Sequence, residues 1–195
     1  ARHADPGLWS YRFVPGTLFR GPDGAVARII LCREAKQEYL DHRVYDHPVL
    51  AGAFSVSLMF AVGALLLPEQ PLTLRDVRFL EAVALGEDID PTLTVVLRRQ
   101  DSEAAWTVTL GAEQDGRWVS YVEAELHTGA DLAPEHPNDP LEPTQALPRT
   151  DLALKLAENA LTWGPSWWWM ADAAVDLPRQ GVRATLKAPT HWTDA

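Results

Sequence analysis

Cysteine is almost absent from the sequence, and its scarcity limits the available chemistry. Cys32 is the single cysteine among 195 residues, which excludes an intramolecular disulfide and a metal site built from several thiolates. This composition fits a reducing compartment, and we expect the cytoplasm. The first ten residues lack a basic stretch followed by an apolar run, so they predict no signal peptide. Because residue 1 is Ala rather than Met, the chain resembles a piece of a longer polypeptide or a processed product.

Basic residues are also fewer than acidic ones. The sequence has 17 Lys and Arg against 27 Asp and Glu, giving a formal net charge of -10. Nucleic acids and anionic membranes both reward a positive surface, so the composition argues against either as a partner. An acidic carrier protein is not excluded, because a local Arg cluster can coexist with a negative total.

A membrane-spanning apolar run is lacking as well. The longest apolar segment runs from Gly52 to Leu67, shorter than the roughly 18–20 residues that a helix needs to cross a bilayer. The apolar fraction of 47% and the charged fraction of 23% are those of an ordinary soluble globular protein. We therefore predict a core helix that is buried on all sides.

Strand-like segments surround this predicted helix. They are Ala25 to Cys32, Leu72 to Phe79, Thr92 to Arg99, Ala105 to Leu110 and Arg117 to Leu126. Asp115-Gly116 between the last two is a strong signal for a hairpin turn. In the last segment the alternation places Trp118, Val122, Ala124 and Leu126 on a buried face, opposite Val119, Tyr121, Glu123 and Glu125. One helix wrapped by a curved antiparallel sheet satisfies this order of elements.

The remaining segments are less regular. Gly16 to Gly24 is rich in turn residues, and Leu40 to Ala53, interrupted by Pro48, is expected to be loop or extended chain. Residues 129–150 hold five prolines and predict a linker. Beyond it we expect a helix from Asp151 to Trp163, then strands from Ala173 to Leu177 and from Gly181 to Ala188. The predicted domains are thus 1–128, the linker 129–150, and a partial unit 151–195.

Two histidines and two acids lie in the loop before the apolar helix. Asp41, His42, Asp46 and His47 all precede Gly52 by a short distance. The N-terminus of a helix offers N–H groups and positive potential, which could polarise a thioester carbonyl. A neutral histidine beside it could act as general base.

Here the sequence resembles the dehydratase domains of polyketide and fatty-acid synthases. Those domains carry His-x3-Gly-x4-Pro within Leu-x-Asp-His-x-Val, followed by Gly-Ala and an apolar helix. The matching residues are Leu40, Asp41, His42, Val44, Val49, Gly52 and Ala53. The chain departs at Asp46, where the family usually has Gly, and at Ala51, where it usually has Pro.

Two later segments extend the resemblance to roughly residues 17 to 190. Leu74 to Leu85 is similar to the family's strand after the helix, and Trp163-Gly164-Pro165-Ser166-Trp167 is similar to its Tyr-Gly-Pro-x-Phe element. The resemblance implies an α+β hot-dog fold, in which a curved antiparallel sheet wraps a long helix, followed by a partial second hot-dog.

The resemblance also implies a reaction. Such a domain removes water from a β-hydroxyacyl thioester on an acyl carrier protein to give an α,β-enoyl thioester. His42 would take the α-proton, and a backbone N–H at the start of the apolar helix would hold the thioester oxygen. An aspartate of the second hot-dog would protonate the leaving hydroxyl, and Asp194 is the candidate for it. The expected substrate-binding residues are Asp46, Ala51, Gly52, Gly164 and Pro165.

The same resemblance defines the expected cofactors and partners. No metal or organic cofactor is expected in the domain, and the substrate arrives on the phosphopantetheine arm of the carrier protein. The expected partners are that carrier protein and the other domains of the synthase, and a homodimer is left open. Because Asp194 stands one residue from the chain end, we expect the 195-residue chain to bind such a substrate without turning it over.

Other interpretations remain open. His42 alone could be a structural histidine near a helix start, and His47 a structural or pocket-rim residue. A metal site at Asp41, His42, Asp46 and His47 lacks the convergent third and fourth donors that metals usually require. The tryptophans Trp167 to Trp169 fit packing or a subunit interface. The domain itself could be a catalytically silent pseudo-dehydratase, or an isomerase that uses the same histidine to shift a double bond.

Overall fold

The computed structural model describes residues 13–31, 36–86, 92–100, 105–129, 145–168, 170–176, 178 and 181–187. The chain forms two compact units. One unit takes 1–36 and 50–133, and the other takes 37–49 and 134–195. The segment 37–49, which contains His42, therefore packs with the C-terminal part of the chain, whereas the sequence prediction placed it in the first hot-dog.

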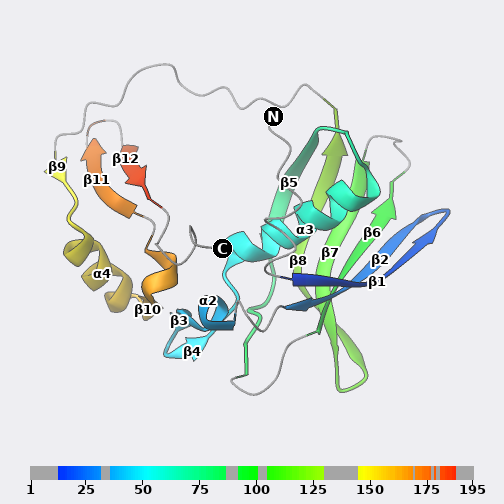
Figure 1. The fold of residues 1–195 in the computed structure, drawn as a ribbon, viewed down its shortest axis with the longest axis horizontal. Helices are drawn as coiled ribbons and strands as arrows, with labels where there is room; N and C mark the ends of the chain where they lie inside the picture. The colour runs from blue at the N-terminus through cyan, green and yellow to red at the C-terminus, as the bar shows by residue number, and fades with distance from the viewer. Residues whose placement is uncertain are drawn as a thin grey trace. The chain divides into compact units, whose positions relative to one another are not determined.

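A six-stranded antiparallel sheet forms the first unit (Figure 1). Its strands in spatial order are β1 (Phe13–Gly21), β2 (Gly24–Leu31), β6 (Thr92–Arg99), β7 (Ala105–Gln114), β8 (Arg117–Thr128) and β5 (Leu72–Phe79). The predicted hairpin at Asp115-Gly116 is confirmed, with φ of 50° and 71° at these two residues. Positive φ at both central residues matches the right-handed twist of the flanking strands.

One face of this sheet carries the apolar core. Alternate residues of the four central strands are buried, as the period of two along a strand requires: Ala27, Ile29 and Leu31; Leu93, Val95 and Leu97; Val108 and Leu110; and Val122, Ala124 and Leu126. Full burial of a Leu or Ile side chain contributes about 1.5–3 kcal/mol. The predicted sheet with one buried face is thus confirmed over these positions.

Helix α3 (Gly52–Leu66) lies against this apolar face (Figure 1). Its buried residues Ser55, Leu58, Met59 and Val62 follow the spacing of one helix face. A side chain at Gly63 would approach the Leu126 Cδ2 atom within 2.9 Å, so the glycine allows the helix to approach the sheet closely.

The prediction that this helix is buried on all sides is wrong. Ala53, Ala64 and Leu65 are exposed, and Leu65 keeps 49% of its surface accessible. The physical reason is geometric, because a single sheet can cover only one side of a helix. Uniform apolarity over Gly52 to Leu67 therefore predicted the helix but not its degree of burial.

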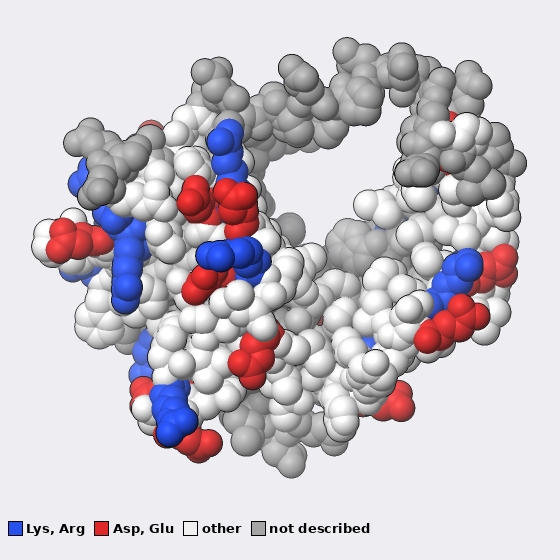
Figure 2. Space-filling view, turned by 180° about the vertical axis from the view of Figure 1, so that it is seen from behind, with Lys and Arg blue, Asp and Glu red and all other residues white. Residues whose placement is uncertain are grey.

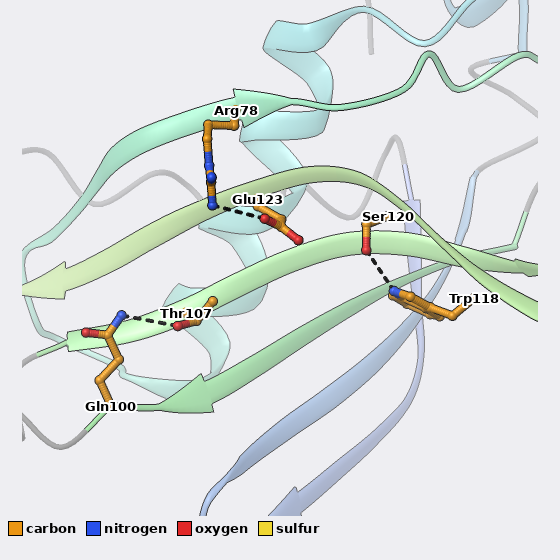
Figure 3. Close-up of polar contacts among 6 residues, drawn as sticks. All are labelled: Arg78, Gln100, Thr107, Trp118, Ser120 and Glu123. Atoms are coloured by element: carbon orange, nitrogen blue, oxygen red, sulfur yellow. Dashed lines mark hydrogen bonds and ion pairs between the residues drawn. The ribbon is translucent and has the colours of Figure 1, made fainter.

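The opposite face of the sheet is polar. Arg78 on β5 forms an ion pair of 3.1 Å with Glu123 on β8, and Gln100 donates to the Thr107 hydroxyl at 3.1 Å (Figure 3). Figure 2 shows acidic and basic side chains interspersed over the face of the molecule seen there. Exposed pairs of this kind contribute little stability, so the sheet is held mainly by its apolar side.

The predicted alternation of buried and exposed residues is wrong over part of β8, because the strand contains a β-bulge. Leu110 pairs with Val122, but the next residue, Gly111, pairs with Ser120, so Tyr121 is an extra residue. This shift reverses the phase: Trp118, predicted to be buried, is 47% exposed, and Tyr121, predicted on the other face, is 3% exposed. The Trp118 indole instead donates to the Ser120 hydroxyl at 3.0 Å (Figure 3).

The buried Tyr121 phenol is electrostatically unusual. Burial, and secondarily the negative charge of Glu81, raise the pKa of Tyr121 above its ordinary value of 10.0, while a hydrogen bond from Gln114 acts to lower it. The Gln114 amide donates to the phenol oxygen at 2.6 Å. The phenol therefore keeps its proton to higher pH in the folded chain than in the unfolded chain.

Two predicted loops contain regular structure. Within Gly16 to Gly24 only residues 22–23 form a turn, because β1 continues to Gly21. Within Leu40 to Ala53, strands β3 (His42–Val44) and β4 (His47–Pro48) form a hairpin. The short helix α2 (Lys36–Leu40) precedes them. In each case pairing with a neighbouring strand, or a single helical turn, adds order that local composition does not predict.

The described residues of the second unit form two small sheets, two α-helices and one 3-10 helix. The sheets have the orders β10-β3-β4 and β12-β11-β9. The remaining elements are β9 (Gln145–Ala146), α4 (Arg149–Glu158), β10 (Leu161–Trp163), the 3-10 helix η2 (Pro165–Trp167), β11 (Met170–Asp176) and β12 (Gly181–Leu186). Strands β11 and β12 lie at the two predicted strand segments, with boundaries shifted by a few residues.

The helix predicted from Asp151 to Trp163 ends earlier, at Glu158. Ala160 takes a φ of 56°, which turns the chain, and the next three residues form β10. Because β10 pairs with β3, a contact distant in sequence overrides the local helical pattern. Most of the predicted linker, residues 130–144, lies outside the described residues.

Candidate active site

A tight hairpin presents His42. Strands β3 and β4 pair Val44 with His47, so Tyr45 and Asp46 form a two-residue turn. Both turn residues have positive φ, 48° and 61°, a conformation that glycine adopts most readily. The Arg43 guanidinium donates to the Asp46 carbonyl at 3.0 Å and closes the turn. The residue at which this chain departs from the family's glycine thus keeps a glycine-like backbone.

The hydrogen bonds of His42 fix its tautomer. The Val49 N–H donates to the His42 carbonyl at 2.9 Å, and the His42 Nδ1 atom lies 2.8 Å from the Val49 carbonyl oxygen. A carbonyl oxygen only accepts, so Nδ1 carries the proton in this contact. In the neutral ring Nε2 is then the unprotonated nitrogen, with a lone pair that can accept a proton.

The Trp167 ring packs against the imidazole of His42. Its ring centroid lies 5.4 Å from that of His42, with the planes tilted by 59°. The Trp167 indole N–H donates to the Glu38 carbonyl at 2.7 Å, which fixes the indole in turn. The half-buried imidazole is therefore restrained by a hydrogen bond at Nδ1 and by an aromatic neighbour.

Strand β10 brings the tryptophan-rich element to this hairpin. Trp163 pairs with His42, Thr162 with Arg43 and Leu161 with Val44. The Tyr45 N–H donates to the Ala160 carbonyl at 2.7 Å and extends the contact to the turn. The two segments that carried the family resemblance, around His42 and from Trp163 to Trp167, are thus neighbours in one unit.

Asp41 joins the same two segments. Its side chain is 8% exposed, and it accepts hydrogen bonds from the Gln37 side chain at 2.7 Å and from the Ser166 backbone N–H at 3.0 Å. Its carbonyl accepts from the Gly164 N–H at 2.6 Å. A side chain at Gly164 would collide with the Asp41 carboxylate. Gly164 therefore permits a close approach that another residue would prevent.

Aromatic and cationic groups support the base of this element. The Trp163 and Trp168 rings meet edge to face at 5.4 Å, and Arg149 lies over the Trp168 ring at 4.6 Å. The Trp168 indole donates to the Trp163 carbonyl at 2.9 Å. Trp163 and Trp168 therefore pack within this unit, and Trp169 of the predicted tryptophan run lies outside the described residues.

The other predicted site residues lie as follows. Asp46 is exposed at the hairpin turn, and Pro165 is the first residue of η2. Ala51 and Gly52 belong to the first unit, where Ala51 caps α3 with φ of -62° and ψ of 141°. Its carbonyl accepts from the Phe54 N–H at 2.9 Å and the Ser55 N–H at 3.1 Å. Asp194 lies outside the described residues.

The sequence did not predict the two groups that contact the His42 ring, the Val49 carbonyl and the Trp167 indole. Nor did it predict that the Asp41 carboxylate would join the His42 hairpin to the turn at Ser166. Val49 and Asp41 matched the family pattern, Asp41 was also part of a possible metal set, and Trp167 belonged to the family-like element and to a run expected to pack or to form an interface. Trp167 is 125 residues from His42, and nothing in a single sequence links positions so far apart.

The donor set near His42 does not form a metal cluster in the structure. No group of three or more His, Cys, Asp or Glu residues that could hold a metal is present among the described residues.

Within the described residues, no helix is both long enough and apolar enough to cross a bilayer.

Solved structures identify the class of fold. The chain is similar to the dehydratase domain from the CurF module of curacin polyketide synthase, with a TM-score of 0.77 and 14% identity over 92% of this chain and 67% of that one. For the CurJ dehydratase domain the TM-score is 0.74 and the identity 21%, over 91% and 63% of the two chains. The dehydratase domain of a mycocerosic acid synthase-like polyketide synthase gives 0.75 and 17%, over 94% and 64%. The fold is thus the hot-dog fold of the polyketide synthase dehydratases.

The family model points to the same proteins. Residues 22–112, just under half of the chain, match the polyketide synthase dehydratase domain. This range contains His42 and α3, so the resemblance stated from the sequence is confirmed. No curated protein sequence matches the chain. The chain spans between 63% and 67% of the length of the dehydratase structures named above.

Variants of the CurJ dehydratase, and of the dehydratase domain from the CurK module of curacin polyketide synthase, are also among the similar structures. A histidine-to-phenylalanine change in CurK, the corresponding type of change in CurJ, and an aspartate-to-asparagine change in CurK each carry the description inactive mutant.

Proposed function

We propose that this chain is part of a dehydratase domain that removes water from a β-hydroxyacyl thioester held on an acyl carrier protein. The observation that carries the proposal is the 2.8 Å contact between Nδ1 of His42 and the Val49 carbonyl oxygen, because in a neutral imidazole this contact leaves Nε2 able to accept a proton. A neutral, oriented imidazole is what proton abstraction next to a thioester carbonyl requires. The activity is that of a lyase.

The reaction needs two proton transfers. Nε2 of His42 takes the α-proton, the electrons of that C–H bond form the new double bond, and the C–O bond at the β-carbon breaks. An acid donates a proton to the departing hydroxyl, which leaves as water. The products are an α,β-enoyl thioester, water, a protonated His42 and a deprotonated acid. His42 later returns its proton to solvent, and the acid takes up a proton from solvent.

The acid is proposed to be an aspartate of a second hot-dog, with Asp194 as the candidate in this chain. Support comes from the CurK aspartate-to-asparagine variant, which is described as inactive. The role of an N–H at the start of α3 toward the thioester oxygen likewise stays a prediction, as do the substrate-binding roles of Asp46, Ala51, Gly52, Gly164 and Pro165.

The partners follow from this chemistry. The phosphopantetheine arm of a carrier protein would deliver the substrate, and the domain itself would need no further cofactor. The other domains of a synthase and a second copy of the chain are further proposed partners. A cytoplasmic location fits the single cysteine.

A matched pair of histidine variants tests the proposal in the intact dehydratase domain that contains this chain. The substrate is a β-hydroxyacyl pantetheine thioester, and the loss of water is followed by mass spectrometry. His42→Ala should lower kcat by about 10²–10⁴-fold, the usual contribution of a positioned base. His47→Ala, an exposed position in the same hairpin, should keep the wild-type rate. Equal rates for His42→Ala and wild type would refute the proposal.

The same assay separates the two alternatives. A pseudo-dehydratase would bind the thioester without converting it, even with wild-type His42. An isomerase would convert an enoyl thioester into its β,γ-unsaturated isomer in a manner that depends on His42, while leaving the β-hydroxyacyl substrate unchanged. One argument for a catalytically silent domain is that the chain departs from the family pattern at Asp46 and Ala51. The backbone speaks against this argument, because Asp46 has a positive φ, as glycine often does, and Ala51 has a φ that suits proline.

A further inference from the structure

Asp41 is a buried acid that the proposed reaction does not use. A carboxylate removed from water is unfavourable unless hydrogen bonds replace its hydration. Here one oxygen accepts from the Gln37 amide at 2.7 Å and the other from the Ser166 N–H at 3.0 Å. Both oxygens are thus committed to groups of the protein. The second of these bonds joins positions 125 residues apart.

The turn that follows β10 is built around this carboxylate. The Gly164 N–H donates to the Asp41 carbonyl, and the absence of a side chain at Gly164 leaves the space that the carboxylate occupies. Ser166, the next contact, is 5% exposed. The backbone from Gly164 to Ser166 is therefore hydrogen-bonded to Asp41 at two points.

This turn ends at the neighbour of the base. Trp167 is the last residue of η2, and its ring lies beside that of His42. The hydrogen bond to the Glu38 carbonyl holds the far end of the indole. Asp41 therefore fixes the start of a turn whose end restrains the imidazole.

We infer that Asp41 is a positioning residue for His42, acting through the turn from Gly164 to Trp167. The inference rests on the proposed function, because His42 must be a base for its position to affect a rate. Asp41 touches neither the substrate nor the reacting atoms. It sets the orientation of Nε2 by holding Trp167 against the ring.

Asp41→Ala in the intact dehydratase domain is the first test. The change leaves the buried Ser166 N–H without its acceptor, so the turn should loosen and Trp167 should leave the imidazole. A small misplacement of a catalytic group lowers the rate by up to about 10²-fold. We expect kcat to fall by about 10- to 100-fold with KM nearly unchanged, a smaller loss than that of His42→Ala.

A double-mutant cycle tests the route of the effect. If Asp41 acts through Trp167, then Asp41→Ala combined with Trp167→Ala should lower kcat no further than the more severe single change. Multiplied losses in the double variant would show independent roles and overturn the inference. Asp172→Ala, an exposed aspartate of β11 in the same unit, is the matched control and should keep the wild-type kcat.

A chemical readout keeps the test independent of activity. Diethylpyrocarbonate modifies unprotonated imidazole nitrogens, and peptide mass spectrometry gives the rate at His42. Asp41→Ala and Trp167→Ala should raise this rate to the same extent, while Asp172→Ala should not change it. If the wild-type domain dehydrates no thioester, the proposed function fails, and the labelling rates still decide whether Asp41 positions His42.

Folding of the variants is checked by circular dichroism. If Asp41→Ala does not fold, Asp41→Asn replaces it, because the amide oxygen can still accept from Ser166 while the amide nitrogen cannot accept from Gln37. An intermediate kcat and an intermediate labelling rate are then expected. A folded Asp41→Ala or Asp41→Asn with wild-type kcat and wild-type labelling would overturn the inference.

Discussion

The two units of this chain are stabilised in different ways. The sheet of the first unit buries alternate apolar residues of its central strands against α3, and Leu58, Met59, Leu110 and Leu126 are almost fully inaccessible. In the second unit α4 has no buried residue, and the histidine hairpin is joined to β10 and η2 by backbone pairing and a few side-chain hydrogen bonds. The first unit therefore depends on apolar packing, whereas the part of the second unit around His42 depends on backbone pairing, a few hydrogen bonds and the packing of its tryptophans.

This difference separates stability from activity. Hydrophobic burial is spread over many residues, so damage to one core position weakens the whole sheet without reaching His42 directly. Hydrogen bonds around the hairpin contribute less to stability, about 1 kcal/mol each, but they orient the base. Substitutions in the two units should thus give opposite patterns of stability loss and rate loss.

The largest effect on stability is expected in the first unit. Leu126→Ala removes a side chain that is 0% exposed and lies against α3 at Gly63. The lost burial and the remaining cavity should lower the free energy of unfolding by about 2–5 kcal/mol. Denaturant unfolding followed by circular dichroism measures this change.

The matched control for that change lies in the second unit. Leu154→Ala, on α4 and 65% exposed, should change the free energy of unfolding by no more than about 0.5 kcal/mol. Equal losses for the two variants would show that packing stabilises both units alike.

A smaller gain is expected where the hairpin and α3 depart from the family. Asp46→Gly relieves a φ of 61°, and Ala51→Pro suits a φ of -62°. Ala51→Pro should raise the free energy of unfolding by about 0.4–1 kcal/mol because proline restricts the unfolded chain. Asp46→Gly should raise it by up to about 1 kcal/mol, because it removes the roughly 1–2 kcal/mol cost of a left-handed residue but adds about 0.5–1 kcal/mol of chain entropy to the unfolded state. The double variant should dehydrate faster than wild type. Thermal unfolding and the thioester assay measure the two effects. Asp172→Gly, within strand β11, should instead lower stability. A double variant that is no faster and less stable would indicate that these residues serve another task.

The smallest effect concerns pH and the first unit alone. Because the pKa of Tyr121 is raised in the folded chain, the unfolded chain loses this proton first as pH rises past about 10. Stability is unaffected below that pH and declines above it. Tyr121→Phe should reduce the decline, as measured by denaturant midpoints near neutral pH and above pH 10. Tyr45→Phe, which removes an exposed hydroxyl, should keep the decline because Tyr121 is still present.

The sheet was largely predictable because its signals are local. Strands β5 and β6 begin and end at the predicted residues, and in the sequence each follows directly after a proline, Pro71 or Pro91. The failures also have local causes. One extra residue at Tyr121 reverses the alternation of β8, and uniform apolarity in α3 cannot reveal that only one side meets the sheet.

The candidate site was predictable only through its family resemblance. His42 was identified from the residues around it, but the partners that restrain it were not. Asp41 accepts hydrogen bonds from the backbone N–H groups of Gly164 and Ser166. Strand β10 forms where the end of a helix was predicted, because it pairs with β3. Such pairings depend on contacts more than a hundred residues apart, for which one sequence carries no periodic signal.

The discontinuity of the second unit has a consequence for biosynthesis. The histidine hairpin leaves the ribosome long before Ser166, its partner 125 residues later. At about 5–20 residues per second, that interval lasts roughly 6 to 25 seconds. During this time the strands of the first unit can pair with one another as they are made. His42 therefore acquires these restraints only after Ser166 and Trp167 have been made, so a nascent chain can form the sheet of its first unit before the proposed base is oriented.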